Sequence, residues 1–182
     1  GGLPLDELPK GLYYPNQFIL MKDSLGGSSS AVAIVDQTCS NIKKLLFDQD
    51  HNWGIKPRNV QQIMAMEILL RTDLPLITLI GKAGTGKTLL ALAAGLMQTE
   101  DFGRFKKLLV ARPIVPVGKD IGYLPGEKDE KLRPWIQPIF DNLEYLFNTK
   151  KPGELDAILA GMKSIEVEAL TYIRGRSIPE QF

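Results

Sequence analysis

Eight residues near the middle of the chain constrain its fold more than any other stretch. They satisfy the pattern G-x-x-x-x-G-K-[ST] and are, in order, Gly81, Lys82, Ala83, Gly84, Thr85, Gly86, Lys87 and Thr88. A short apolar run, Leu76 to Ile80, precedes them, and a run rich in alanine and leucine, Thr88 to Met97, follows them. The first run has the length of a strand, and the second has the length of a buried helix. The order of strand, glycine loop and helix predicts an α/β fold.

Each fixed residue of this octet has a mechanical task at a phosphate-binding site. Glycines allow backbone N–H groups to approach phosphate oxygens without interference from a Cβ atom, and the helix that begins here adds its positive end. Lys87 would place a charge against the β- and γ-phosphates, and the Thr88 hydroxyl would coordinate Mg²⁺. The sequence therefore predicts that Gly81 to Thr88 binds ATP and Mg²⁺. Lys87 and Thr88 are the candidate catalytic residues, and Thr88 is the candidate metal ligand.

Composition places the chain among ordinary globular proteins. Its 182 residues suffice for one well-packed domain with a small appendage, and its formal net charge of +1 does not mark it as a nucleic-acid binder. The sequence has no apolar run of the roughly 20 residues that a membrane helix needs. With one cysteine, Cys39, and one histidine, His51, it can form neither an internal disulfide nor a Cys/His zinc cluster. We expect a cytoplasmic protein without a membrane partner.

The first third of the chain has the pattern of a small β subdomain. Two apolar runs, Phe18 to Met21 and Ala31 to Val35, flank a loop rich in glycine and serine, which predicts a hairpin. The stretch from Asp48 to Arg58 then reads as a linker. We therefore divide the chain into a β-rich region with its linker, residues 1–54, and a main domain, residues 55–182.

Apolar runs alternate with helical patterns in the main domain. Asn59 is a candidate cap for a helix that reaches Leu70. Further on, strands are predicted at Lys107 to Ala111 and Ile165 to Ile173, and helices at Ile136 to Phe147 and Leu155 to Met162. This alternation predicts a parallel sheet covered by helices.

ATP hydrolysis in this class of protein also needs an aspartate at a strand end, commonly followed by a glutamate. The pairs Asp6-Glu7 and Asp129-Glu130 lie in polar surroundings, and neither fits. Asp36-Gln37 follows an apolar run, but it precedes the octet, and a turn after a strand explains it more simply. We expect the acids to lie beyond Phe182 or to be absent, so that this chain binds Mg-ATP and hydrolyses it poorly.

Several segments outside the octet resemble one family. The stretches Val110 to Lys119, Ile121 to Gly126, Lys131 to Trp135 and Tyr172 to Arg176 are similar to those of PhoH-like ATPases, and the similarity covers Ile55 to Phe182. The resemblance implies a P-loop NTPase fold related to RecA and superfamily 1 helicases, with an incomplete parallel sheet that stops before the acidic Walker B motif. It also implies action on single-stranded RNA and assembly into a homo-oligomeric ring, expected to be a hexamer.

The resemblance also suggests roles for residues outside the octet. Gln62 lies upstream of the loop, as the adenine-reading glutamine does in superfamily 1 helicases, and its amide can match the donor and acceptor on the edge of adenine. A helix-surface glutamine is the alternative. Arg174 and Arg176 are candidates for contact with the nucleotide of a neighbouring subunit, and surface arginines are the alternative there.

A basic stretch between Arg104 and Arg133 is the candidate RNA surface. It holds eight lysines and arginines against four acidic residues, a local excess of four positive charges. Such an excess attracts a phosphate backbone, and Tyr123 or Trp135 is available for stacking on bases. The candidate nucleic-acid residues are Arg112, Lys119, Tyr123 and Arg133, and a solvated charged surface is the alternative explanation.

The sequence therefore favours the ATP-binding portion of an ATPase that unwinds or remodels RNA. A non-catalytic module whose assembly depends on nucleotide is the alternative that the unplaced acidic pair supports. A small-molecule kinase is a third possibility, and it would need a cluster of lid arginines and an acid that binds the acceptor.

Overall fold

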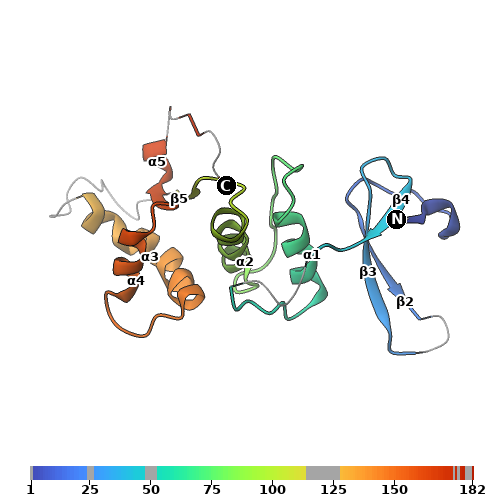
Figure 1. Ribbon diagram of the computed structural model, residues 1–182, viewed down its shortest axis with the longest axis horizontal. Coiled ribbons are helices and arrows are strands. Elements are labelled where there is room, and N and C mark those ends of the chain that lie inside the picture. Colours follow the sequence, from blue (N-terminus) through green and yellow to red (C-terminus); the bar gives the residue numbers. More distant parts are fainter. Residues whose placement is uncertain are drawn as a thin grey trace. The chain divides into compact units, whose positions relative to one another are not determined.

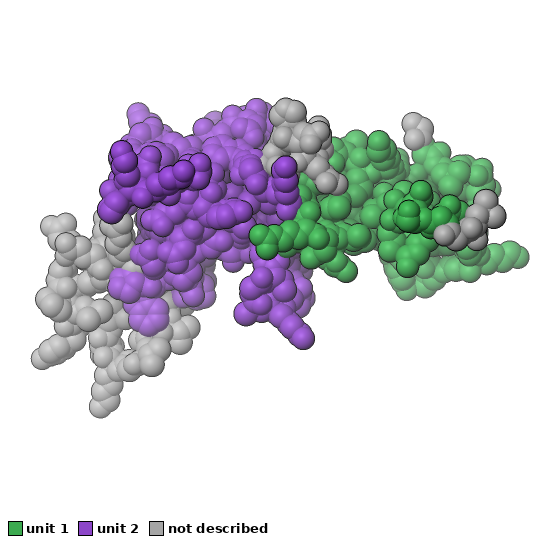
Figure 2. Space-filling view, turned by 90° about the horizontal axis from the view of Figure 1, so that it is seen from below, with its two compact units in different colours: residues 1–49, 57–74 green, residues 50–56, 75–182 purple. Residues whose placement is uncertain are grey.

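The computed structural model describes residues 2–23, 27–47, 53–113, 128–173, 175, 177, 178 and 182, and of residues 128–133 and 172 it describes the backbone alone. The chain forms two compact units (Figure 2). Unit 1 comprises residues 1–49 and 57–74, and unit 2 comprises residues 50–56 and 75–182.

Unit 1 is built on a small antiparallel sheet. Its elements are β1 (Leu3–Pro4), a 3-10 helix (Leu5–Glu7), β2 (Phe18–Lys22), β3 (Ser30–Val35), β4 (Asn41–Lys44) and α1 (Val60–Leu69). The strand order is β1-β4-β3-β2. Strands β2 and β3 form the predicted hairpin, with Phe18 opposite Ile34 and Lys22 opposite Ser30 (Figure 1).

The core of this sheet is small and apolar. Its buried residues, Ala33, Val35 and Ile42, pack against partly buried side chains from the loops and from β2, namely Leu5, Leu8, Tyr13, Ile19, Met21 and Cys39. A core of this size removes little apolar surface from water, so polar contacts carry a larger share of the stability of unit 1.

Helix α1 begins where the sequence predicts. The Asn59 side chain accepts a hydrogen bond from Gln62 N at the start of α1. This contact satisfies one of the backbone donors that a helix leaves unpaired in its first turn. The helix ends at Leu69, one residue before the predicted end at Leu70.

A buried carboxylate fastens the segment after β4 to α1. Glu67 is 4% exposed, and its Oε2 accepts from Leu46 N at 2.9 Å and from Phe47 N at 2.8 Å. Two backbone donors are thereby satisfied by one charged acceptor, a strong form of hydrogen bond. The contact explains why this charged residue is buried.

Unit 2 carries the α/β part of the chain. Its elements are α2 (Lys87–Leu96), a π-helical turn (Met97–Asp101), β5 (Leu108–Arg112), α3 (Lys128–Phe147), α4 (Glu154–Gly161), β6 (Ile165–Ala169) and α5 (Leu170–Ile173). Helix α2 is buried over most of its length, as its alanine-rich sequence predicts. None of the helices in the described ranges combines the length and apolar character that a membrane span requires.

Strands β5 and β6 form the predicted parallel pair. The register runs from Leu108 opposite Ile165 to Arg112 opposite Ala169. On the other edge of β5, the backbone of Phe182 donates to Lys107 O at 2.9 Å and accepts from Leu109 N at 3.0 Å. The mixed α/β character and the parallel sheet thus agree with the sequence prediction.

The strand predicted at Leu76 to Ile80 is wrong for this structure. The structure assigns no strand to these residues, and Leu76 and Ile80 are 82% and 95% exposed. A strand exists through its ladder of hydrogen bonds to a neighbour. In the described part of the chain, β6 and Phe182 occupy the two edges of β5, and β6 pairs with β5 alone, so neither strand pairs with this segment.

Two other predicted boundaries differ from the structure. Strand β6 ends at Ala169 and not at Ile173, because β5 ends at its partner Arg112 and offers no further ladder. Helix α3 begins at Lys128 and contains Pro134 and Pro138, whereas the sequence predicted a start at Ile136. Proline usually ends or kinks a helix, and the segment before Ile136 that the prediction left out contains Pro134.

Candidate functional site

The octet from Gly81 to Thr88 forms a tight loop at the start of α2. Gly84 and Gly86 have φ angles of 75° and 84°, in the left-handed region that side chains disfavour. Gly86 is the cap of α2, and Lys87 is its first helical residue. Gly84, at a variable position of the pattern, and Gly86, at a fixed one, therefore adopt a backbone conformation that favours glycine.

Lys87 lies across the loop and contacts the backbone at its beginning. Its Nζ donates to Gly81 O at 2.9 Å and to Lys82 O at 2.8 Å, and it lies 3.4 Å from Thr85 Oγ1. Thr85 Oγ1 in turn donates to Lys82 O at 2.9 Å. A single ammonium group is thus held by three oxygens of the same loop.

The loop leaves room for an anion where its backbone is bare. A Cβ atom built on Gly81 would come within 3.4 Å of Thr85 Oγ1, and nothing lies within 4 Å of one built on Gly84. The first turn of α2 contributes unpaired N–H groups and the positive end of its dipole. Backbone donors, a helix start and Lys87 together fit the phosphates of a nucleotide.

A magnesium ion fits this loop only as a partner of the phosphates. Thr88 is exposed in the first turn of α2, where its hydroxyl can be a ligand. Within the described ranges, no group of three or more His, Cys, Asp or Glu side chains could hold a metal ion. The chemistry of the loop therefore suits Mg²⁺ bound jointly by Thr88 and phosphate oxygens.

Gln62 belongs to unit 1, whereas the phosphate loop belongs to unit 2. The side-chain oxygen of Gln62 accepts from Arg58 N at 2.7 Å, while Gln62 N donates to Asn59. These two contacts resemble a capping box, in which the third helical residue reaches back to the chain before the helix. They fix the orientation of the Gln62 amide at the start of α1.

Of the candidate nucleic-acid residues, Arg112 is the one whose side chain the structure describes. It is the exposed last residue of β5, at the carboxyl end of a parallel strand, where ligands gather in open α/β sheets. Lys119 and Tyr123 lie outside the described residues, and of Arg133 the structure gives only the backbone in α3. The inter-subunit candidates Arg174 and Arg176 also lie outside the described residues.

Asp36 forms the turn that the sequence favoured for it. Its Oδ1 accepts from Ser40 N at 2.9 Å and its Oδ2 from Asn41 Nδ2 at 3.2 Å. The Ser40 backbone N–H, with smaller contributions from Asn41 and Thr38, lowers the pKa of this carboxyl to about 2. Asp36 therefore stabilises the link between β3 and β4.

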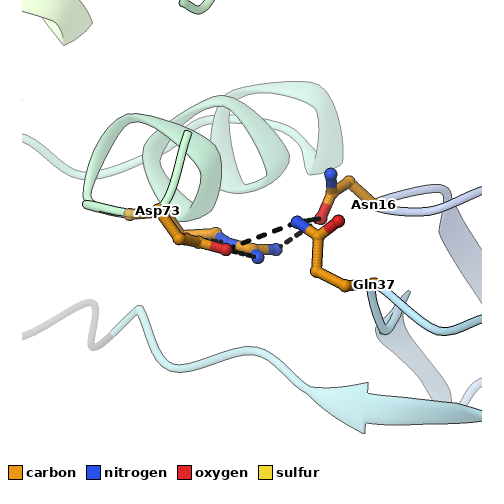
Figure 3. A network of polar contacts seen from close by, with 4 residues as sticks. Asn16, Gln37 and Asp73 are labelled. Atoms are coloured by element: carbon orange, nitrogen blue, oxygen red, sulfur yellow. Dashed lines mark hydrogen bonds and ion pairs between the residues drawn. The ribbon is translucent and has the colours of Figure 1, made fainter. Parts of the chain in front are cut away.

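Sequence reasoning missed a polar network in unit 1 (Figure 3). Arg71 Nη1 donates to Asn16 Oδ1 at 2.7 Å, and Arg71 forms a two-pronged ion pair with Asp73. Gln37 Nε2 lies within hydrogen-bond distance of both Asn16 Oδ1 and Asp73 Oδ2. No sequence signal could have found this network, because its members are up to 57 positions apart in the chain.

The ion pair within this network shifts the pKa values of both partners. The side-chain bonds from Arg71 lower the pKa of Asp73 to about 2. The same bonds raise the pKa of Arg71 above its ordinary value. Both side chains are therefore charged at neutral pH, where they form an ion pair.

Comparison with known families gives one match that covers most of the chain. Residues 54–182 match the sequence profile of the family described as PhoH-like protein. The matched range includes the phosphate loop, β5 and the segments that carry the sequence resemblance.

Individual relatives extend the similarity to the first third of the chain. Protein PhoH2 of Bacillus subtilis is 74% identical over 180 residues, which are 99% of this chain and 41% of that protein. Protein PhoH2 of Mycolicibacterium smegmatis is 41% identical over 160 residues, which are 87% of this chain and 35% of that protein. A PhoH-like protein of Bacillus subtilis is 32% identical over 129 residues, 71% of this chain and 38% of that relative. The chain therefore spans about two-fifths of the length of these relatives or less.

Proposed function

Because the chain belongs to the PhoH-like family, whose members generally bind ATP, we propose that it is the ATP-binding portion of an ATPase that unwinds or remodels RNA. The family has a P-loop NTPase-like fold, and the mixed α/β structure with its parallel strands is consistent with that fold. We further propose that the complete domain is of the type found in RecA and superfamily 1 helicases. The division into residues 1–54 and 55–182 is part of this proposal.

The observation that carries the proposal is the loop from Gly81 to Thr88. It combines left-handed glycines, the start of α2 and an ammonium group that is already held above the loop backbone. Preorganised donors bind a phosphate more tightly because they lose less freedom on binding. Such a constellation suits the triphosphate of a nucleotide better than an uncharged ligand.

In this proposal each loop residue has a defined role toward ATP. Lys87 is placed against the β- and γ-phosphates, and the backbone N–H groups of the loop surround the β-phosphate. The Thr88 hydroxyl coordinates Mg²⁺, which when bound neutralises charge on the phosphates. Gln62 reads the edge of adenine with its amide. The acids that hydrolysis requires would come from the rest of the full-length protein.

RNA contact is proposed for the basic stretch that includes Arg112. A guanidinium group at the end of β5 can bind backbone phosphates, and Lys119, Tyr123 and Arg133 are the further candidates. For an RNA motor of this type we expect the full-length protein to assemble into a hexameric ring. We expect it to act in the cytoplasm. Arg174 and Arg176 would then face the nucleotide of a neighbouring subunit.

The test of this function is ATP turnover by the full-length protein with and without single-stranded RNA. We expect RNA to raise the turnover rate, and a strand-displacement assay to show ATP-dependent unwinding. Lys87→Ala is the control that should abolish both signals. No effect of RNA on turnover, together with no unwinding, would contradict the motor function while leaving ATP binding intact.

A non-catalytic assembly module is the second candidate. The sequence offered Asp36 as an acid that follows a strand, the position of the acid that hydrolysis needs. In the structure its carboxylate bonds Ser40 and Asn41 within a turn, which favours a module without hydrolysis. Under this alternative the full-length protein would change its oligomeric state with Mg-ATP and show no turnover. Size determination with and without Mg-ATP, beside the turnover assay, distinguishes the two.

A further inference from the structure

The hydroxyl of Thr85 occupies a position that the loop pattern leaves open. In G-x-x-x-x-G-K-[ST] this residue is the last of the four variable positions, so the pattern gives it no task. In the structure, Thr85 Oγ1 donates to Lys82 O at 2.9 Å and lies 3.4 Å from Lys87 Nζ. A hydroxyl has one donor and two acceptor sites, so both contacts can exist together.

These contacts complete the coordination of the Lys87 ammonium group. An ammonium has three donors, and three oxygens of the loop lie within reach, those of Gly81, Lys82 and Thr85. The lysine stem has many rotamers, and holding it in one of them costs conformational entropy. A loop that restrains this side chain before the ligand binds therefore loses less conformational freedom on binding.

Thr85 also fixes the turn from which these oxygens project. Its bond to Lys82 O spans the left-handed residue Gly84, which alone would leave the turn free to open. Lys82 O accepts from both Thr85 and Lys87, so the position of the lysine depends on the turn that the threonine closes. A Cβ atom built on Gly81 would lie 3.4 Å from this hydroxyl, in ordinary van der Waals contact, so the hydroxyl lies directly beside the start of the loop.

We propose that Thr85 is a positioning residue for Lys87, and that its hydroxyl sets the affinity of the loop for the β- and γ-phosphates of ATP. This inference rests on the proposed ATP-binding function. It assigns to a variable position of the loop a role that acts through another side chain.

The test compares Thr85→Val with Thr85→Ser in the full-length protein by measuring the Kd for Mg-ATP and Mg-ADP. Valine keeps the shape of threonine without the hydroxyl, and serine keeps the hydroxyl. Since a neutral hydrogen bond contributes about 0.5–1.5 kcal/mol, we expect Thr85→Val to raise the Kd about three- to tenfold. Thr85→Ser should stay within about twofold of the unsubstituted protein.

Thr149→Val is the matched control. The Thr149 hydroxyl also donates to a backbone carbonyl, Glu144 O, at an exposed site in the same unit. This substitution removes the same group at a place remote from the loop in sequence. We expect no change in the Kd for either nucleotide.

A double-mutant cycle separates positioning from a general effect on the fold. If Thr85 acts through Lys87, then Lys87→Ala costs about three- to tenfold less affinity in the Thr85→Val background than in the unsubstituted protein. Equal costs in both backgrounds, an unchanged Kd in Thr85→Val, or a Thr85→Ser variant as weak as Thr85→Val would each overturn the inference. An unchanged Kd in Lys87→Ala would instead contradict the proposed function itself.

Discussion

The phosphate loop and the Arg71 network both concentrate polar contacts around one cation, and they are built in opposite ways. Lys87 finds its partners, Gly81, Lys82 and Thr85, within seven consecutive residues. Arg71 instead bonds Asp73 beside it and Asn16, which is 55 positions away.

This difference links the loop to ligand binding and the Arg71 network to stability. A local cluster costs little chain entropy to assemble, so it can persist on a loop and remain available to a ligand. A long-range cluster ties distant segments together, and its loss releases them. The loop should therefore govern nucleotide affinity with little effect on folding, and the Arg71 network should do the reverse.

The largest expected effect is on nucleotide affinity and comes from removing the Lys87 ammonium group from the loop. Lys87→Ala should raise the Kd for Mg-ATP at least about 100-fold, because charge-assisted bonds to two phosphates contribute about 1.5–3 kcal/mol each. Isothermal titration calorimetry measures the loss. Lys82→Ala is the control in the same loop, because Lys82 contributes its carbonyl to the contacts described above, and it should change the Kd less than about threefold. Equal losses in the two variants would contradict the role given to Lys87.

Glu67 gives the largest expected effect on stability in unit 1. Glu67→Ala leaves the N–H groups of Leu46 and Phe47 without their acceptor, which should cost about 2–3 kcal/mol of unfolding free energy. Urea denaturation followed by circular dichroism measures this loss, and Glu67→Gln, which retains an oxygen, should lose less. Glu7→Ala, at an exposed glutamate, is the control without an expected effect. A midpoint unchanged in Glu67→Ala would refute the anchoring role.

Arg71→Ala tests the long-range network directly. The Arg71 and Asp73 side chains are 20% and 50% exposed, so solvent weakens the pair, and we expect a loss of about 1–2 kcal/mol. Faster amide hydrogen exchange should appear in β2 and α1, the segments next to Asn16 and Arg71. Arg71→Lys keeps the charge without the planar fork and should recover only part of the protection. Exchange that stays unchanged in these segments would show that the network does not tie them together.

The smallest expected effect is on the pH dependence of stability in acid. The pKa of Asp73 falls from an ordinary 3.8 to about 2 in the folded chain, so its contribution is full above pH 3.8 and is lost as the pH falls toward 2. Solvent screening of this half-exposed group limits the effect to a few tenths of a kcal/mol. Asp73→Asn should flatten the pH dependence of the melting temperature in this window. Part of the pH dependence should remain, because Asp36 also has a pKa of about 2. An identical slope in Asp73→Asn would count against the ion pair.

The same contrast explains how much could be predicted from sequence. The loop, the cap at Asn59, the hairpin and helix α2 follow from neighbouring residues, and the structure agrees with each. The ends of β6 and the path of Leu76 to Ile80 depend on which strand lies alongside, and local patterns carry no such information. The Arg71 network and the anchoring role of Glu67 depend on contacts 20 or more positions apart, so no spacing rule could reveal them.

The most direct test of nucleotide binding by the loop is chemical-shift mapping of the ¹⁵N-labelled chain titrated with Mg-ATP. We predict saturable shifts of the amides from Gly84 to Thr88, whose N–H groups would face the phosphates, and none of comparable size in the sheet of unit 1. Lys87→Ala should remove these shifts at the same nucleotide concentration. Saturable binding that leaves the amides of the loop unmoved, or no binding at millimolar Mg-ATP, would contradict the account.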